Sequence, residues 1–365
     1  MDNFNTEPNI PQGRFDINDL KTWLEPLVKE PISGFEFFPL KGDASDRTYF
    51  RVHYYLQSRP AEKLSIIIMQ LKEAEPEKEP DFNRMQKFLH QLDMPVPQIL
   101  YYDAGRGLLF LEDGGDTHLE DLTRNSPDNL ILWYQKAIEL IVAMQTRGTQ
   151  SMTSHCPAHA LQFDVEKLMW EMDFMIKHYI KGLLNRPLDA NAESEIRRAL
   201  LELCETLAQE EKVFVHRDFH SRNLMVRQDN LMLIDFQDAR MGPRQYDLVS
   251  LLKDSYVILP EETRNQLLDY YLQRIEQEES RPLPRSHFMK IFDCMSIQRN
   301  LKAIGSFASQ YMEHQNDRYL QYIEPTLQYI RDTMHARPDL KPLSQALGQA
   351  IPELQIGSHN EGPSS

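Results

Sequence analysis

The sequence predicts an α+β protein with two lobes, a five-stranded antiparallel N-terminal lobe and a mainly helical C-terminal lobe. The chain of 365 residues is longer than a single hydrophobic core usually supports. The period of the apolar residues changes from two, typical of strands, to about 3.6, typical of helices, near residues 112–116. We therefore expect the joint between the two lobes at this point.

The N-terminal lobe is predicted from three kinds of pattern. Apolar residues at helical spacing over 19–29 predict a helix, and alternating residues over 47–55 predict a half-buried strand. A continuous apolar centre over 64–71 predicts a buried strand. The full set of expected elements is helices at 19–29 and 82–92 and strands at 35–40, 47–55, 64–71, 95–102 and 108–112.

The C-terminal lobe is predicted to be helical with one interruption by strands. Expected helices cover 131–146, 163–184, 193–209 and 246–330, the last broken by two prolines at 281–285, and expected strands cover 213–215, 224–226 and 231–234. The lobe boundaries that follow are a flexible terminus at 1–14, an N-terminal lobe at 15–112, a C-terminal lobe at 113–358 and a disordered tail at 359–365.

Composition excludes several classes of protein. Hydrophobic residues make up 41% of the chain, which is enough for a sizeable core and argues against global disorder. Lys and Arg number 40 against 55 Asp and Glu, a net charge of −15. A chain this acidic lacks the basic surface that nucleic-acid binding requires. We therefore expect no nucleic-acid partner.

Cysteines and the N-terminal sequence predict a compartment. Cys156, Cys204 and Cys294 are far apart and form no C-x-x-C pair, which argues against a disulfide framework or a structural zinc site. The first residues contain no basic segment followed by an apolar one, and no apolar run approaches the length of a membrane span. The sequence thus predicts a reduced, cytoplasmic protein without a membrane partner.

The pattern with the clearest chemistry is His216-Arg-Asp218-Phe-His-Ser-Arg-Asn223, followed by Asp235-Phe-Gln after a predicted strand pair. Asn223 and Asp235 offer the oxygen ligands that Mg²⁺ prefers. Asp218 can orient an acceptor hydroxyl and take its proton, and His216 can hold the loop by hydrogen bonds. The pattern matches the protein-kinase signature H-R-D-x-x-x-x-N with a following D-F-G, and so predicts phosphoryl transfer.

Asp and Asn are also common turn and cap residues, so the pattern has an alternative, purely structural interpretation. The spacing, the flanking apolar strands and the position after a β-rich lobe together favour the catalytic interpretation. Asp247 is expected to support the loop through hydrogen bonds, and Asp238 to lie close to the metal.

Four stretches carry a resemblance to a known family, namely residues 42–51, 216–225, 235–252 and 298–307. The sequence resembles the aminoglycoside phosphotransferase/choline kinase-like branch of the protein-kinase-like superfamily. Within that branch it is most similar to bacterial kinases that phosphorylate the anomeric hydroxyl of N-acetylmuramate and N-acetylglucosamine in cell-wall recycling. The resemblance implies a bilobal protein-kinase-like fold, ATP and Mg²⁺ as cofactors, and a small-molecule sugar acceptor. It leaves the oligomeric state open.

The resemblance also implies nucleotide-binding residues in the lobe at 15–112. Expected phosphate-binding residues in the first hairpin turn are Gly42, Asp43, Ala44 and Ser45, and residues expected to meet adenine are Leu111, Glu112 and Asp113. Met69 stands where protein kinases carry a phosphate-pairing lysine, so Arg47, Arg51 or Lys72 is expected to supply the positive charge. The alternatives are an ordinary hairpin turn and an exposed acidic connection.

Three residues of the lobe at 113–358 are candidates for acceptor binding, namely Glu171, Arg222 and Arg299. A solvated helix face is the alternative for Glu171 and Asp173, and a structural ion pair is the alternative for Arg299. These two acids would also suit a cationic alcohol such as an aminoglycoside or choline. A third possibility is a binding module with weak catalysis, because the third strand lacks its lysine and Gln237 replaces the glycine of D-F-G.

Overall fold

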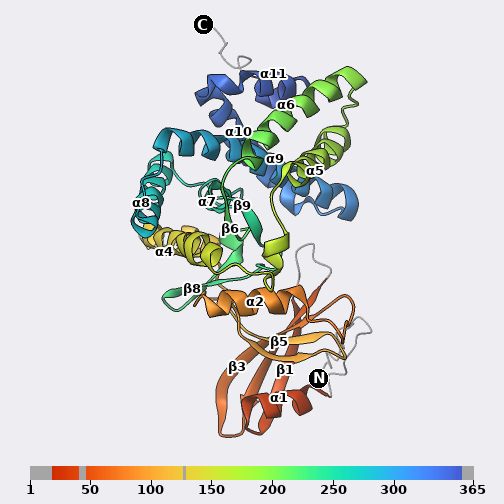
Figure 1. Cartoon of the computed structure of the whole chain (residues 1–365). Helices are drawn as coiled ribbons and strands as arrows, with labels where there is room; N and C mark the ends of the chain where they lie inside the picture. Colours follow the sequence, from red (N-terminus) through yellow and green to blue (C-terminus); the bar gives the residue numbers. More distant parts are fainter. Residues whose placement is uncertain (1–18, 41–46, 126–128, 356–365) are drawn as a thin grey trace. The chain divides into compact units, whose positions relative to one another are not determined.

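The computed structural model of the chain describes residues 19–40, 47–125 and 129–355. The chain divides into two compact units (Figure 1), one of Met1–Gln86 with Pro97–Gly114 and one of Lys87–Val96 with Gly115–Ser365. The sequence analysis had assigned residues 87–96 to the N-terminal lobe. The predicted fold class is confirmed, because the first unit holds a five-stranded antiparallel sheet and the second is mainly helical.

The first unit is built around the sheet, whose strand order is β1-β2-β3-β5-β4 with antiparallel neighbours. Its elements are α1 (Leu20–Val28), β1 (Ile32–Leu40), β2 (Thr48–Leu56), β3 (Arg59–Gln70), β4 (Ile99–Asp103) and β5 (Leu108–Glu112), and α2 (Asp81–Gln91) begins in this unit and ends in the other.

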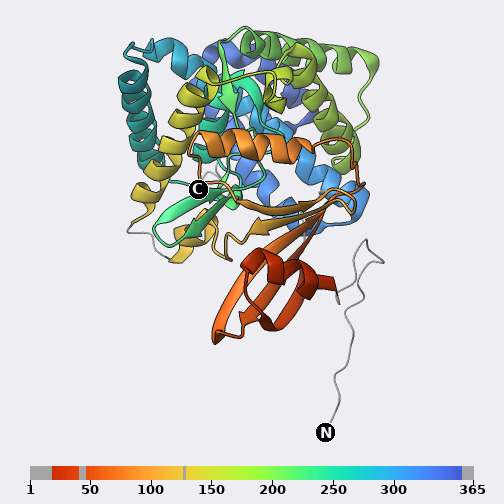
Figure 2. The same cartoon turned by 60° about the horizontal axis from the view of Figure 1, so that its bottom comes forward.

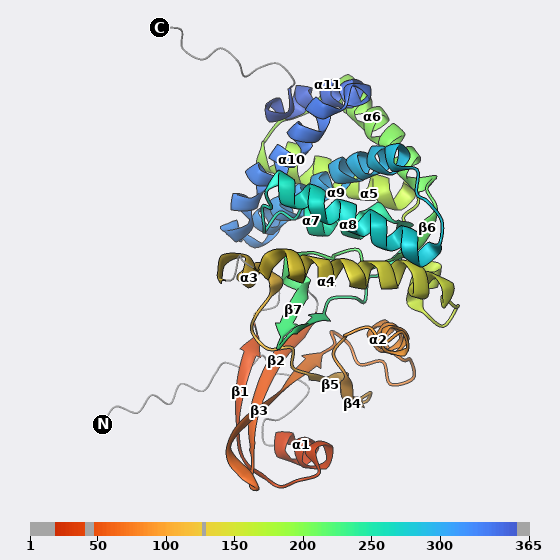
Figure 3. The same cartoon turned by 90° about the vertical axis from the view of Figure 1, so that its left-hand side faces the viewer.

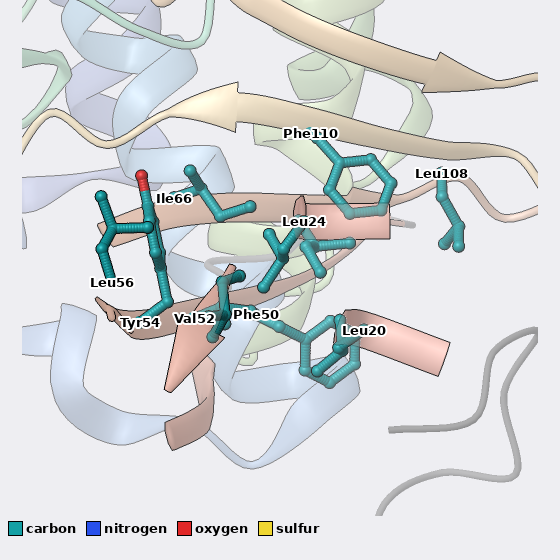
Figure 4. Packing of buried hydrophobic residues seen from close by; sticks show 11 residues of the cluster. Leu20, Leu24, Phe50, Val52, Tyr54, Leu56, Ile66, Leu108 and Phe110 are labelled. Atoms are coloured by element: carbon teal, nitrogen blue, oxygen red, sulfur yellow. The ribbon is translucent and has the colours of Figure 1, made fainter. Parts of the chain in front are cut away.

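The core of this unit lies between α1 and one face of the sheet (Figure 2). Leu20 and Leu24 of α1 are fully buried with Phe50 and Val52 of β2, whose burial alternates along the strand (Figure 4). Because side chains of a strand alternate between faces, Arg51 points to the opposite face of the sheet. The period of two in the sequence thus separates the core residues of β2 from Arg51, a predicted nucleotide-binding residue.

Three strands begin several residues away from their predicted starts, and the first of them, β1, begins at Ile32 instead of 35. β3 begins at Arg59 instead of 64, because residues 57 and 58 form a tight turn that pairs Leu56 with Arg59. β4 begins at Ile99 instead of 95, because Pro95 and Pro97 have no N–H to donate to a neighbouring strand.

Among the described residues, the second unit consists of α-helices, shorter helical turns and two strand pairs. Its longer helices are α3 (Leu119–Asn125), α4 (Leu130–Ala143), α5 (Val165–Met175), α6 (Ala190–Ala208), α7 (Gln245–Leu252), α8 (Glu261–Glu279), α9 (Arg285–His314), α10 (Ile323–Ala336) and α11 (Lys341–Ala350). Its strands are β6 (Lys212–Val215), β7 (Leu224–Arg227), β8 (Asn230–Leu233) and β9 (Arg240–Pro243). π-helical segments extend α4 over Met144–Gly148 and α5 over Ile176–Leu183.

Helix α9 is the centre of this unit and packs against α5, α7 and α10, while α4 and α8 lie side by side (Figure 3). α9 approaches α5 closely at Gly305, where an added Cβ would lie 2.8 Å from the Cα of Met175. A larger residue there would force the two helices apart. Within the described ranges, no helix has the length and apolar character required to cross a membrane.

β9 is the strand that the sequence analysis missed. It contains Gly242 and ends at Pro243, a composition typical of turns, yet it pairs antiparallel with β6. A Cβ at Gly242 would lie 2.7 Å from the ring of Phe163, so glycine lets β9 pass under this aromatic residue. The predicted helical run 246–330 is also broken at 253–260 and at 315–316, between separate helices.

Candidate active site

The loop from His216 to Asn223 follows the buried strand β6 and ends in a short 3₁₀ turn before β7. β7 pairs with β8, so the chain returns to the loop, where the Ile234 N–H donates to the Asn223 carbonyl at 3.1 Å. Asn223 Nδ2 donates to the Asp218 carbonyl at 2.9 Å and lies 3.4 Å from Asp235 Oδ2. The structure therefore brings the predicted residues Asp218, Asn223 and Asp235 together.

Two residues of this region have left-handed backbone conformations. The φ angle is 82° at Arg217 and 63° at Asp235. Such conformations cost non-glycine residues about 1–3 kcal/mol each and persist only where surrounding contacts enforce them. Both residues adjoin the predicted chemistry, which identifies the loop as a place where geometry outweighs local backbone preference.

Asp247 of α7 supplies the contacts that hold the start of the loop. Its two carboxylate oxygens accept the N–H groups of His216 at 2.6 Å and Arg217 at 3.0 Å. The side chain is fully buried, and burial raises the pKa of Asp247 to about 7, although the two N–H donors act in the opposite direction. Asp247 thus fixes the unusual conformation of Arg217.

His216 holds the other side of the loop. Its buried ring lies with Nε2 3.0 Å from the carbonyl of Ile234, and burial lowers the pKa of the imidazole. A neutral ring donates this hydrogen bond only as the Nε2–H tautomer. His216 therefore links the loop to the residue before Asp235.

Asp254 is a second buried carboxylate that the sequence analysis did not select. Its oxygens accept the N–H groups of Ser221 and Tyr256, each at 2.9 Å. Burial raises its pKa. An acid so close to the buried Leu251 and Leu252 of α7 was the available signal, because a carboxylate among apolar residues requires donors.

Asp218 has an ion-pair partner that sequence reasoning also missed. Lys302 Nζ of α9 donates to Asp218 Oδ1 at 2.8 Å, and Arg217 Nε lies 3.9 Å from Oδ2. Burial alone would raise the pKa of Asp218, but the positive charges of Lys302 and Arg217 outweigh it and hold that pKa well below its usual range. Asp218 is therefore an ionised carboxylate.

The donor set at Asn223 and Asp235 fits magnesium. Among the described residues, no group of three or more His, Cys, Asp or Glu side chains could hold a metal ion. Magnesium needs fewer protein ligands, because it takes one or two carboxylates together with phosphate and water oxygens. Asp235 is exposed, and Gln237 Nε2 orients it by donating to Oδ1 at 2.7 Å. Asp238, also exposed, lies 3.2 Å from a terminal nitrogen of Arg217.

Two of the candidate acceptor residues are occupied by buried contacts. Glu171 is buried, and its Oε2 accepts from Gln298 Nε2 at 3.0 Å. Arg299 is also buried and donates from Nε to Ser250 Oγ at 2.6 Å. The solvated face considered for Glu171 is wrong, because Gln298 of α9 covers it. A substrate contact of either residue stays a prediction.

Arg222 lies in an aromatic setting. Its guanidinium donates to Glu120 Oε2 at 2.6 Å and to the Tyr322 hydroxyl at 2.7 Å. The guanidinium carbon also lies 3.8 Å from the centre of the Tyr256 ring. These contacts fix the orientation of Arg222, and its role toward a substrate stays a prediction.

The predicted nucleotide residues fall in the first unit. Gly42, Asp43, Ala44 and Ser45 lie outside the described residues. Arg51 forms a two-pronged ion pair with Asp113, with Nε 2.7 Å from Oδ2 and a terminal nitrogen 2.9 Å from Oδ1. The β3 residue beside Arg51 is Ile67, and Met69 is buried, so the end of β3 next to Arg51, residues 66–70, carries no charged side chain.

The remaining nucleotide candidates lie near the ends of their strands. Leu111 is buried in β5, and the Glu112 N–H donates to the Gln98 carbonyl at 2.9 Å. Arg47 lies over the ring of Phe82 at 5.8 Å, and Lys72 follows the end of β3. Their roles toward a nucleotide stay predictions.

Known proteins match the chain over most of its length. N-acetylmuramate/N-acetylglucosamine kinase of Neisseria meningitidis is 29% identical over 349 residues, covering 93% of this chain and 97% of the relative. The protein of the same name from Pseudomonas putida is 30% identical over 363 residues, covering 96% and 99%.

Solved structures share the fold at low sequence identity. An aminoglycoside phosphotransferase in complex with gentamicin superposes with a TM-score of 0.55 at 16% identity, covering 86% of this chain and 96% of that one. Choline kinase from Cryptosporidium parvum gives 0.54 at 13% identity, covering 86% and 93%. The sequence profile described as the phosphotransferase enzyme family matches residues 36–283. With this match, and with the loop of Asp218 and Asn223 inside it, the chain belongs to the phosphotransferase enzyme family.

Proposed function

We propose that the chain transfers the γ-phosphoryl group of ATP, with Mg²⁺, to the anomeric hydroxyl of N-acetylmuramate and N-acetylglucosamine. The observation that carries the proposal is the ionised Asp218 beside Asn223 and Asp235. Four relatives named as kinases of these two sugars support the acceptor, at 25–30% identity over 86–96% of the chain. The similarity extends past residue 283, where the family profile ends, and so includes α9.

Asp218 acts as the base in this proposal. Its carboxylate accepts a hydrogen bond from the anomeric hydroxyl and aligns the sugar oxygen with the γ-phosphorus. The new oxygen–phosphorus bond forms as the bond to the leaving ADP oxygen breaks, and the proton of the hydroxyl passes to Asp218. Because Lys302 occupies Oδ1, the proton goes to Oδ2, the oxygen farther from a cation.

Asn223 and Asp235 would hold Mg²⁺ through their side-chain oxygens. When bound, the ion neutralises charge on the phosphates during transfer. The protein's part is orientation, because the Asn223 amide is fixed by the Asp218 carbonyl and the Asp235 carboxylate by Gln237.

For the nucleotide, we propose the predicted residues of the first unit. Residues Gly42–Ser45 would offer N–H groups to phosphate, and backbone groups of Leu111, Glu112 and Asp113 would meet adenine. Arg51, with Arg47 as the other candidate, would supply the charge that the missing lysine gives in protein kinases. We propose that the reaction takes place in the cytoplasm, a reducing compartment, and the three free, buried cysteines agree with this.

A cationic acceptor is less well supported. The carboxylates that would attract it are engaged within the chain, Glu171 with Gln298 and Asp173 with Arg197. A binding module without catalysis is less well supported too, because Asp218 and its two partners are all present.

The test is a measurement of ATP consumption with a panel of acceptors, namely both N-acetylated sugars, choline and an aminoglycoside. Phosphorus NMR of the reaction should show a sugar 1-phosphate with either N-acetylated sugar. Consumption of a cationic alcohol without turnover of either sugar would reject the proposed acceptor and keep the phosphotransferase. No turnover with any acceptor would favour the binding module.

A further inference from the structure

Four cations lie close to one another in a chain whose net charge is −15, and two of them, Arg217 and Lys302, pair with Asp218. They are Lys167 of α5, Arg217 of the catalytic loop, Arg240 of β9 and Lys302 of α9, hereafter the cation cluster. Burial lowers the pKa of Lys167, and the charges of Arg217, Arg240 and Lys302 lower it further. Burial and the charge of Arg217 likewise lower the pKa of Arg240. The four charges are therefore close enough to repel one another.

Three members of the cation cluster are committed to neighbours. Lys302 donates to Asp218, Arg217 lies between Asp218 and Asp238, and Arg240 Nε donates to the Asp238 carbonyl at 3.2 Å. Arg217 Nε is nevertheless a buried donor without a hydrogen-bond acceptor in the part of the chain that the structure describes. This N–H beside the proposed base is a donor that an acceptor atom from outside the chain can satisfy.

Lys167 is the member with the loosest attachment. Its nearest carboxylate oxygen, Glu171 Oε1, lies 3.7 Å away, and no described acceptor lies within hydrogen-bonding distance of its Nζ. The ammonium rests 3.9 Å from the centre of the Trp170 ring, which is half exposed. About a quarter of the Lys167 side chain is exposed to solvent. Lys167 can therefore accept an external anion without breaking a hydrogen bond.

We propose that Lys167 is a specificity residue that binds a carboxylate on the acceptor, with Arg217 as the second donor. This inference rests on the proposed function. The two sugars differ in one group, the lactyl carboxylate on C3 of N-acetylmuramate, two ring carbons from the anomeric carbon. With the anomeric hydroxyl on Asp218, a cation to one side of the base suits that carboxylate. A site for a cationic acceptor would place carboxylates there instead.

Lys167 and Lys302 then have different effects on the two sugars. Lys302 contacts Asp218 directly, so its loss should affect the reaction at the anomeric hydroxyl, a group that both sugars have. Among the described residues, Lys167 makes no direct contact with Asp218 or with the proposed metal ligands, so its loss should act mainly on the carboxylate. An interaction made equally in the ground state and the transition state appears in KM, not in kcat.

The experiment compares kcat and KM for N-acetylmuramate, its neutral methyl ester and N-acetylglucosamine in wild type and Lys167→Met. Methionine keeps a long apolar stem over Trp170, which protects the fold. We expect kcat/KM for N-acetylmuramate to fall about tenfold through KM, with the two neutral sugars unchanged. Lys167→Arg should restore most of the loss.

The matched control is Lys181→Met. Lys181 follows on the same helical segment, and it pairs with Glu193 at 2.7 Å on the exposed surface. The Lys181→Met variant removes the same charge as Lys167→Met and should leave kcat and KM for all three sugars unchanged. Equal losses for charged and neutral sugars in Lys167→Met, or no loss for any, would overturn the inference while the proposed function stands. Failure of the wild type to phosphorylate either sugar would reject both.

Discussion

The loop from His216 to Asn223 is held by one kind of carboxylate, and the proposed base on it is a carboxylate of another kind. Asp247 and Asp254 are fully buried, and each accepts two backbone N–H groups. Asp218 faces Lys302 and Arg217, and Asp235 is exposed. Burial raises the pKa of the first pair, whereas neighbouring cations lower the pKa of Asp218. Neighbouring groups thus decide whether a carboxylate at this loop favours its protonated form, as the anchors do, or its ionised form, as the proposed base requires.

The two anchoring carboxylates, Asp247 and Asp254, lie in α7 and in the chain that follows it. A buried carboxylate needs donors with fixed positions, and the backbone N–H groups of a tight loop provide them. The base needs a cation that leaves one oxygen free, and Lys302 binds only Oδ1. Loss of the base should therefore lower turnover, whereas loss of an anchor should change the stability of the fold.

The largest expected effect is on the reacting side. Asp218→Asn removes the proton acceptor and keeps the shape, so kcat should fall by about 10²–10⁴ while the melting temperature and ATP affinity stay close to wild type. A coupled ATP assay measures the loss, and circular dichroism checks the fold. Turnover of the folded variant near the wild-type value would exclude Asp218 as the base.

Asp235→Ala should lower both turnover and Mg²⁺-dependent nucleotide binding, with an expected loss of about 10² in kcat, because an oxygen ligand between protein and phosphate is removed. Calorimetry of ATP binding with and without Mg²⁺ measures this effect. Asp229→Ala is the control, since Asp229 lies in the turn between β7 and β8. If Mg²⁺ strengthens ATP binding to the same extent in both variants, Asp235 is not a ligand.

Much of the reacting side could be predicted from sequence. Asp218, Asn223 and Asp235 lie within 18 positions along the chain and are joined by one strand pair, so spacing alone brings them together. The five-stranded sheet was predictable too, because alternation along β2 reports which face is buried.

The cations and anchors were not predictable in this way. Lys302 is 84 positions from Asp218, and Asp254 is 33 from Ser221, so only the packing of α7 and α9 brings them to the loop. A solvated helix face was the alternative for Glu171, but the residue is buried and bonded to Gln298 from α9. Tertiary contacts between distant helices leave no local periodicity to detect.

The anchoring side should show in the pH dependence of stability. Because the pKa of Asp247 is raised to about 7 in the folded state, folding favours its protonated form. Its contribution is fully present below the unfolded-state pKa and is lost as pH rises toward 7. We expect a loss of about 2–3 kcal/mol in the free energy of unfolding between pH 5 and pH 8.

Urea unfolding at several pH values in wild type and Asp247→Asn isolates this contribution. The variant cannot titrate at this position, so its free energy of unfolding should fall less over the same pH range. If the free energy of unfolding changes with pH equally in the two proteins, Asp247 has an ordinary pKa. The contrast with Asp218 would then be removed.

The smallest expected effect concerns Lys302, the cation that pairs with Asp218 and lowers its pKa. Lys302→Met removes the ion pair at 2.8 Å, but Arg217 remains 3.9 Å from the other oxygen of Asp218. We expect kcat to fall about tenfold with N-acetylmuramate and N-acetylglucosamine alike, with KM for ATP little changed. Lys302→Arg should recover part of the loss, since it restores a cation but not its position. Lys290→Met removes the same charge from an exposed site on α9 and should be neutral. A loss confined to one sugar would mean that Lys302 binds the acceptor, and the base would then depend on Arg217 alone.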